Sequence, residues 1–115
     1  MNIKDKVAIV TGAGSGIGAA VCRELATRGA RVVILVDRRD NVFELADSID
    51  TASGRQVAEV HVGDTTNDTF RSQVYDEVTA RHGVASICVP AAGITRDALA
   101  VAEGSDRRGG GSTYR

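Results

Sequence analysis

Short, continuous runs of apolar residues alternate with amphipathic segments along most of the chain. The runs are rich in β-branched residues, which is typical of parallel strands that are buried on both faces. They predict strands over residues 6–10, 31–36, 56–62 and 84–89. Between these runs, apolar residues recur at helical spacing, which predicts a helix in each intervening segment.

Capping residues and glycines set the ends of the predicted helices. The first helix covers about residues 16–28 and stops at Gly29, the second ends before Ser53, and the third closes at His82 and Gly83. The side chains suited to cap the second helix and the third helix are Asp40 or Asn41, and Thr66, Asn67 or Asp68. Right-handed crossovers between parallel strands then give the strand order 3-2-1-4, which is half of a doubly wound α/β sheet.

Composition narrows the class of protein. The chain has 115 residues, of which 43% are hydrophobic and 3% aromatic, so we expect one domain with an aliphatic core. The formal net charge of −1, with acids and bases interspersed, argues against nucleic acid or an anionic membrane as a partner. No apolar run approaches membrane-spanning length, and the N-terminus has no signal-peptide pattern. Cys22 and Cys88 are expected in the core of a cytoplasmic protein.

The strongest chemical signal lies between the first strand and the first helix. Residues 11–18 are Thr-Gly-Ala-Gly-Ser-Gly-Ile-Gly, with Gly12, Gly16 and Gly18 in the spacing T-G-x-x-x-G-x-G. Glycines let the backbone approach a pyrophosphate, and the free amides and dipole of a helix N-terminus favour the anion. The alternative is a tight turn without a ligand. The position of the motif between a strand and a helix favours a nucleotide site.

This motif resembles that of the short-chain dehydrogenase/reductase family, whose members move a hydride between a nicotinamide cofactor and a carbonyl or alcohol. The resemblance implies a Rossmann-type doubly wound parallel sheet, here its N-terminal half only. It also implies that Ser15 and Ile17 line the dinucleotide together with the three glycines. Gly18→Val is then expected to abolish dinucleotide binding, and Gly12→Ala to weaken binding while leaving the fold largely unchanged.

Asp37 follows the second strand. In a dinucleotide-binding unit an acid here accepts hydrogen bonds from the adenosine ribose, which favours NAD over NADP. Two alternatives stay open: Arg38 or Arg39 pairs with the 2′-phosphate of NADP, or Val36 occupies the place of the acid because the strand is one residue longer than usual. An ordinary turn aspartate is a further interpretation. NAD is the expected cofactor and NADP the alternative.

Asp64 and Thr65 follow the third strand. Asp64 matches the family's strand-end aspartate that meets the adenine edge, and a carboxylate is a sound acceptor for the adenine amino group. Asp64 is also suited to cap a turn or the third helix, and both roles are compatible.

Residues 90–97, Pro-Ala-Ala-Gly-Ile-Thr-Arg-Asp, resemble the family's Asn-Asn-Ala-Gly motif and its continuation. The continuation looks most like the branch of 3-oxoacyl carrier-protein and acetoacetyl-CoA reductases. Pro90 and Ala91 replace the asparagines, whereas Ala92 and Gly93 still let the backbone approach the adenosine ribose. The alternative is a strand that ends in a plain glycine turn.

No residue is predicted to be catalytic or to bind a metal. The family's general acid is a tyrosine, and a lysine four residues later lowers its pKa. The only lysines of this chain, Lys4 and Lys6, precede both tyrosines. His61 and His82 have no carboxylate or cysteine partner at ligand spacing, so both are expected to be structural.

The composition changes towards the end of the chain. Residues 1–102 are expected to form an incomplete dinucleotide-binding domain with a short helical pattern at 96–101, and the polar, glycine-rich residues 103–115 a disordered tail. We expect a truncated or frame-disrupted family member, or a fragment, whose fourth strand is an exposed edge, open to self-association or to pairing with a full-length relative. The function hypotheses are an NAD(P)-dependent oxidoreductase for a ketone or secondary alcohol such as a 3-oxoacyl thioester, a non-catalytic nucleotide-binding module, and a fragment without function.

Overall fold

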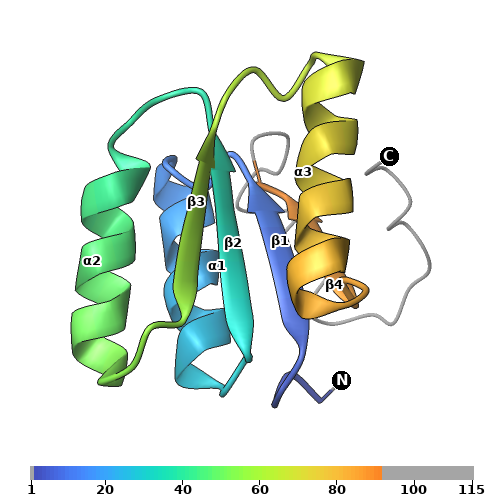
Figure 1. The fold of residues 1–115 in the computed structure, drawn as a ribbon. Coiled ribbons are helices and arrows are strands. Elements are labelled where there is room, and N and C mark those ends of the chain that lie inside the picture. Colours follow the sequence, from blue (N-terminus) through green and yellow to red (C-terminus); the bar gives the residue numbers. More distant parts are fainter. Residues whose placement is uncertain (1, 92–115) are drawn as a thin grey trace, which may run out of the picture.

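Strands and helices alternate along the chain as predicted. The computed structural model describes residues 2–91 (Figure 1), and the predictions for Ala92, Gly93, the helical pattern at 96–101 and the tail at 103–115 lie outside the described residues. The elements are, in order, β1 (Val7–Thr11), α1 (Gly16–Thr27), β2 (Val32–Asp37), α2 (Val42–Ser53), β3 (Ala58–Val62), α3 (Asp68–His82) and β4 (Ile87–Pro90).

The strands form one parallel sheet in the order β3-β2-β1-β4, which confirms the predicted Rossmann-type topology. Helices α1 and α2 cover one face of the sheet and α3 covers the other (Figure 1). Successive side chains of a strand point to opposite faces. Ala8 and Val10 therefore join the core under α1 and α2, whereas Val7 and Ile9 join the core under α3.

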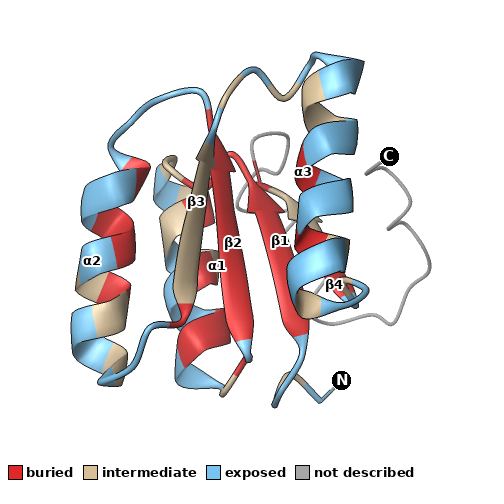
Figure 2. Cartoon of the chain, in the orientation of Figure 1, coloured by how far each residue is buried: buried red, intermediate tan, exposed pale blue. Residues whose placement is uncertain are grey.

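The two central strands are buried along their whole length (Figure 2). Burial on both faces explains why β1 and β2 show no alternation of polar and apolar residues. Burial of a side chain such as Ile9 or Ile34, relative to its exposure to water, stabilises the folded state by about 1.5–3 kcal/mol. No helix within residues 2–91 is long and apolar enough to cross a membrane.

Capping confirms the start of α3 and corrects the start of α2. Asn67 Oδ1 accepts a hydrogen bond from the Phe70 amide at 2.8 Å, so Asn67 is the side-chain cap of α3. Asn41 stands at the cap position of α2, but its side chain makes no capping hydrogen bond. Helix α2 is closed by Gly54, the residue directly after it, whose φ of 73° is a left-handed conformation that glycine adopts readily.

The fourth strand differs from its prediction. β4 begins at Ile87 rather than at residue 84, and Val84 is 66% exposed. The apolar run therefore starts in the loop after α3. Pro90 pairs with Thr11 at the end of the ladder, where an edge strand tolerates a missing amide. Within residues 2–91, β4 pairs only with β1, and its pairing with another chain stays a prediction.

The two cysteines differ in burial. Cys22 on α1 is fully buried, and this burial raises the pKa of its thiol to about 12. Cys88 on β4 is only half-buried, less than predicted, because β4 lies at the edge of the described sheet. Cys22 is therefore a core residue, as expected.

Gly63 lies between the end of β3 and Asp64 in the sequence, and it packs closely against the ring of Phe70. Its amide donates to the Asp37 carbonyl at 2.9 Å, and a Cβ atom on Gly63 would lie 2.3 Å from Phe70 Cε1. Gly63→Ala should therefore displace the Phe70 ring from the core under α3 and lower the free energy of unfolding by about 1–3 kcal/mol. Urea denaturation followed by circular dichroism measures this change.

A second background serves as the control. In a Phe70→Leu chain the same Gly63→Ala substitution should cost less, because the ring that it would strike is gone. An equal cost in both backgrounds would show that the Phe70 ring is not the obstacle.

Candidate functional site

The loop between β1 and α1, residues 12–15 and called the glycine loop below, makes a tight turn at the carboxyl end of β1. Gly12 has a φ of 72°, which residues with a Cβ atom rarely adopt. The Gly12 carbonyl accepts hydrogen bonds from the Ser15 amide at 3.1 Å and from Ser15 Oγ at 2.8 Å. The loop therefore closes on itself before the helix begins.

Ser15 also caps α1. Its Oγ accepts a hydrogen bond from the Gly18 amide at 3.0 Å, and its carbonyl accepts one from the Ala19 amide. The amides of Gly16 and Ile17 belong to the first turn, where a helix offers them no carbonyl. No acidic residue stands in this turn itself to oppose the positive end of the helix dipole. These features suit an anion.

The glycines of the motif differ in their surroundings. A Cβ atom on Gly18 would lie 2.1 Å from the Gly12 carbonyl oxygen, so Gly18 lets the helix approach the loop. A Cβ atom on Gly16 would meet nothing within 4 Å. Gly12→Ala is not the mild substitution expected from the sequence, because the positive φ of Gly12 would strain any side chain there. The side chain of Ile17 packs against the core under α1 and α2.

Asp37 ends β2 beside this loop. Asp37 is 5% exposed, and its carboxylate accepts hydrogen bonds from the Gly14 amide at 2.8 Å and the Arg39 amide at 3.0 Å. The Arg39 side chain lies 3.5 Å from the same carboxylate. Val36 is 1% exposed and belongs to the core under α3. At the end of β2, the side chain that faces the glycine loop is therefore that of Asp37 and not that of Val36.

Opposing effects act on the pKa of Asp37. Burial raises the pKa of a carboxyl group, but hydrogen bonds from the Arg39 and Gly14 amides and the charge of Arg39 lower it. The net result is a pKa below the ordinary value. Asp37 is therefore ionised at neutral pH while most of its acceptor capacity is in use.

Asp64 follows β3 and organises a turn. Its Oδ1 accepts hydrogen bonds from the Thr66 amide at 2.9 Å and from Thr66 Oγ1 at 2.7 Å. The two hydrogen bonds from Thr66 lower the pKa of the exposed Asp64 carboxyl; desolvation raises it by less, and the charge of Arg38 lowers it further. The Thr65 carbonyl accepts from the Arg71 side chain at 2.6 Å. The predicted turn role of Asp64 is thus confirmed, and its contact with adenine stays a prediction.

The carboxyl ends of β1, β2 and β3 meet at one edge of the sheet because the strands are parallel. The Gly63 amide bonds to the Asp37 carbonyl at 2.9 Å, which joins the ends of β2 and β3. Asp37 in turn bonds to the glycine loop. The candidate residues of the first three strand ends therefore lie along the same edge.

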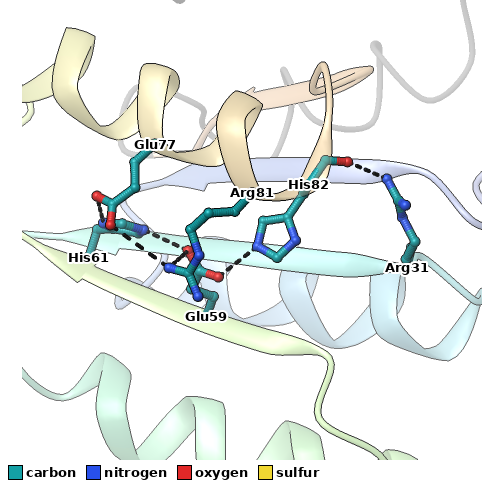
Figure 3. A network of polar contacts seen from close by, with 6 residues as sticks. All are labelled: Arg31, Glu59, His61, Glu77, Arg81 and His82. Carbon is teal, nitrogen blue, oxygen red and sulfur yellow. Dashed lines mark hydrogen bonds and ion pairs between the residues drawn. The ribbon is translucent and has the colours of Figure 1, made fainter.

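A polar cluster missed at the level of sequence lies away from this edge, between β3 and α3 (Figure 3). Glu59 accepts hydrogen bonds from His61 Nε2 at 2.9 Å and from His82 Nε2 at 2.8 Å. The sequence showed neither histidine a carboxylate partner at ligand spacing, whereas the fold gives both of them Glu59 in a structural network. The contact between Glu59 and His82 was missed because the two residues are 23 positions apart in the sequence. The contact between Glu59 and His61 forms because residues two apart in a strand lie on the same face.

The cluster links a helix to an edge strand. Arg81 lies 3.3 Å from Glu59 and 3.8 Å from Glu77. Burial raises the pKa of Glu59, but hydrogen bonds from His82 and His61 and the charge of Arg81 bring it below the ordinary value. No group of acidic, histidine or cysteine side chains within residues 2–91 is arranged to hold a metal ion. The cluster holds α3 against β3.

Comparison with known proteins gives consistent matches. The family model described as short chain dehydrogenase matches residues 6–107. The 3-oxoacyl-acyl-carrier-protein reductase of Escherichia coli is 34% identical over 99 residues, which cover 86% of this chain and 38% of that protein. The short-chain dehydrogenase/reductase homolog YusS of Bacillus subtilis is 33% identical over 96 residues, which cover 84% of this chain and 87% of that protein. The chain thus spans well under half of the first relative and most of the second.

Two solved structures have similar folds. A metagenomic short-chain oxidoreductase in complex with NADP has a TM-score of 0.68 and 34% identity, with 76% of this chain and 39% of that chain covered. L-sorbose reductase from Gluconobacter frateurii, complexed with NADPH and L-sorbose, has a TM-score of 0.67 and 31% identity, with 76% and 34% covered.

Glu59→Gln should weaken the attachment of α3 and lower the free energy of unfolding at pH 7 by about 1–2 kcal/mol, because an amide accepts less strongly than a carboxylate. The pKa of Glu59 is depressed in the folded chain. Its contribution is therefore present above the ordinary glutamate pKa and is lost as the pH falls through the folded pKa. The difference between wild type and variant should persist from pH 7 to about pH 5 and shrink below about pH 4.

Urea denaturation at a series of pH values measures this difference. Asp76→Asn, at an exposed position on the same helix, is the matched control and should change stability little at any pH. A Glu59→Gln difference that stays constant down to pH 3 would contradict the role given to the carboxylate.

Proposed function

The chain belongs to the short-chain dehydrogenase family, and we propose that its glycine loop binds the pyrophosphate of a nicotinamide dinucleotide. The observation that carries the proposal is the start of α1. There the Gly16 and Ile17 amides have no helical carbonyl to bond, and the space beside the Cα atom of Gly16 is open. Open space next to unpaired amides at a helix N-terminus is the arrangement that an incoming phosphate needs.

The rest of the dinucleotide is proposed to follow the same edge of the sheet. Gly12, Ser15 and Gly18 shape the loop, Asp37 and Arg38 stand where the adenosine ribose would lie, and Asp64 with Thr65 would meet the adenine. The order of these residues along β1, β2 and β3 supports this direction, because the strand ends are neighbours in that order. Two relatives with solved structures were complexed with NADP or NADPH, which supports a nicotinamide dinucleotide as the ligand.

For the whole protein we propose hydride transfer between the nicotinamide and a ketone or secondary alcohol. The nicotinamide supplies or accepts the hydride. The name of the Escherichia coli relative supports a 3-oxoacyl thioester as the substrate class. This chain's own part is to bind and orient the cofactor, because its only lysines, Lys4 and Lys6, precede both tyrosines and cannot follow one by four residues. We propose a cytoplasmic location, which the two free cysteines, Cys22 and Cys88, support.

Gly16→Ala separates dinucleotide binding from folding. The added methyl group meets no protein atom, so the melting temperature should change by less than about 2 °C. The same methyl group would lie where the phosphate approaches, so the affinity for NADH should fall about tenfold or more. Isothermal titration calorimetry and thermal melting of the same samples measure the two effects.

Gly54→Ala is the control with the opposite pattern. Gly54 ends α2 with a φ of 73°, so alanine there should lower stability while leaving affinity for the dinucleotide unchanged. Wild-type affinity in Gly16→Ala, or a wild-type melting temperature indifferent to millimolar NAD and NADP, would refute binding at this loop.

The choice between NAD and NADP rests on the charged residues at the end of β2 and directly after it. The ionised Asp37 should repel a 2′-phosphate, so we expect NAD to bind more tightly than NADP. Arg38→Ala should then leave the affinity for NAD unchanged. Titration of wild type and variant with both dinucleotides measures this. A wild-type preference for NADP that disappears in Arg38→Ala would assign the 2′-phosphate to Arg38 and contradict the expectation.

A further inference from the structure

Asn41 contacts the glycine loop instead of capping its own helix. It lies directly before α2 with φ −63° and ψ −12°, and its side chain makes no capping hydrogen bond. Its Nδ2 donates to the Gly14 carbonyl at 3.2 Å, across a separation of 27 residues. Asn67, which caps α3 through its side chain, shows what an asparagine at this position ordinarily does.

Both polar groups of the Gly14 backbone are held by residues that lie between the end of β2 and the start of α2. The Gly14 amide donates to Asp37 Oδ2 at 2.8 Å, and the Gly14 carbonyl accepts from Asn41. A Cβ atom on Gly14 would lie 2.5 Å from Asn41 Oδ1 and 3.0 Å from Asp37 Oδ2. The carboxamide therefore lies directly against Gly14, a glycine outside the spacing of the family motif.

The loop is thus fixed from two sides. On the β1 side, the Gly12 carbonyl accepts two hydrogen bonds from Ser15. On the β2 side, Asp37 and Asn41 hold Gly14. Gly14 and Ser15 directly precede Gly16, the first residue of α1. An orientation fixed at Gly14 therefore sets the direction in which the first amides of the helix point.

We propose that Asn41 is a positioning residue for the dinucleotide: with Asp37, it fixes Gly14 so that the loop is ordered before the pyrophosphate arrives. The proposal rests on the proposed function of the loop and adds a residue outside it. Order in the free protein lowers the entropic cost of binding, so loss of the Asn41 contact should weaken affinity although Asn41 itself need not touch the ligand.

Asn41→Ala tests the role in two independent measurements. Hydrogen–deuterium exchange of the ligand-free chain should be faster at residues 14–17 in the variant. The affinity for NADH by isothermal titration calorimetry should fall roughly three- to tenfold, the effect of one hydrogen bond. The melting temperature should change by less than about 2 °C, since Asn41 is exposed and no cap is lost. A merely structural role would lower the melting temperature and leave both other readouts unchanged.

Two further variants define the contact. Asn41→Asp keeps the shape of the side chain but removes the donor to Gly14, so it should weaken NADH binding at least as much as Asn41→Ala. Gly14→Ala should weaken binding in the wild type, where the methyl group strikes the carboxamide, and should cost less in an Asn41→Ala background. Glu44→Ala, exposed in the same first turn of α2, is the control and should leave affinity and loop exchange unchanged.

The outcomes distinguish this proposal from the proposed function. If wild type binds NADH and Asn41→Ala binds it equally well with unchanged exchange, the role of Asn41 is refuted while the function of the loop stands. If wild type binds neither NAD(H) nor NADP(H), the proposed function fails and the role of Asn41 in dinucleotide binding fails with it.

Discussion

The structure depends on the parallel pairing of β1 with β2 at the centre of the sheet. Both strands are buried on both faces, so their side chains and backbone groups are removed from water together. The ladder pairs Thr11 with Val36 and continues for one more bond, from the Ala13 amide to the Val36 carbonyl. This register brings the glycine loop out of the sheet directly beside the carboxylate of Asp37. A slip of one residue would turn every side chain of the strand to the other face and separate the two.

In the glycine loop and at the start of α1, each residue has a separate structural role. The positive φ of Gly12 reverses the chain, and the missing side chain of Gly18 lets the helix approach. Ser15 satisfies the Gly18 amide, so the amides that remain at the helix start are those of Gly16 and Ile17. The side chains of Asp37 and Asn41 occupy the space against Gly14. The site is therefore made largely of backbone groups, with side chains acting mainly to orient them.

The two faces of the sheet are closed in different ways. Under α1 and α2 the contacts are a continuous aliphatic core. Under α3 the apolar core is smaller, and at the edge strand β3 it gives way to Glu59, His61 and residues of α3 (Figure 3). An edge strand is only half-buried, which allows a charged network that the centre of the sheet would exclude. The attachment of α3 thus depends on charge as well as on apolar contact.

The sequence by itself determined the alternation of strands and helices, the strand order, the glycine loop and a cap for α3 at Thr66, Asn67 or Asp68, of which the structure selected Asn67. These features follow from short-range periodicity, from capping chemistry within one turn and from the handedness of crossovers. Only the tertiary structure decided that Asn41 bonds to Gly14, that Glu59 joins His61 to His82, and that β4 begins at Ile87. The first two depend on which residues the fold brings together across more than 20 positions. The start of β4 depends on where β1 begins to pair with it, because Ile87 pairs with Ala8. Apolar runs and local motifs do not predict such contacts, because the contacts depend on the register of the strands and on the packing of the helices against the sheet.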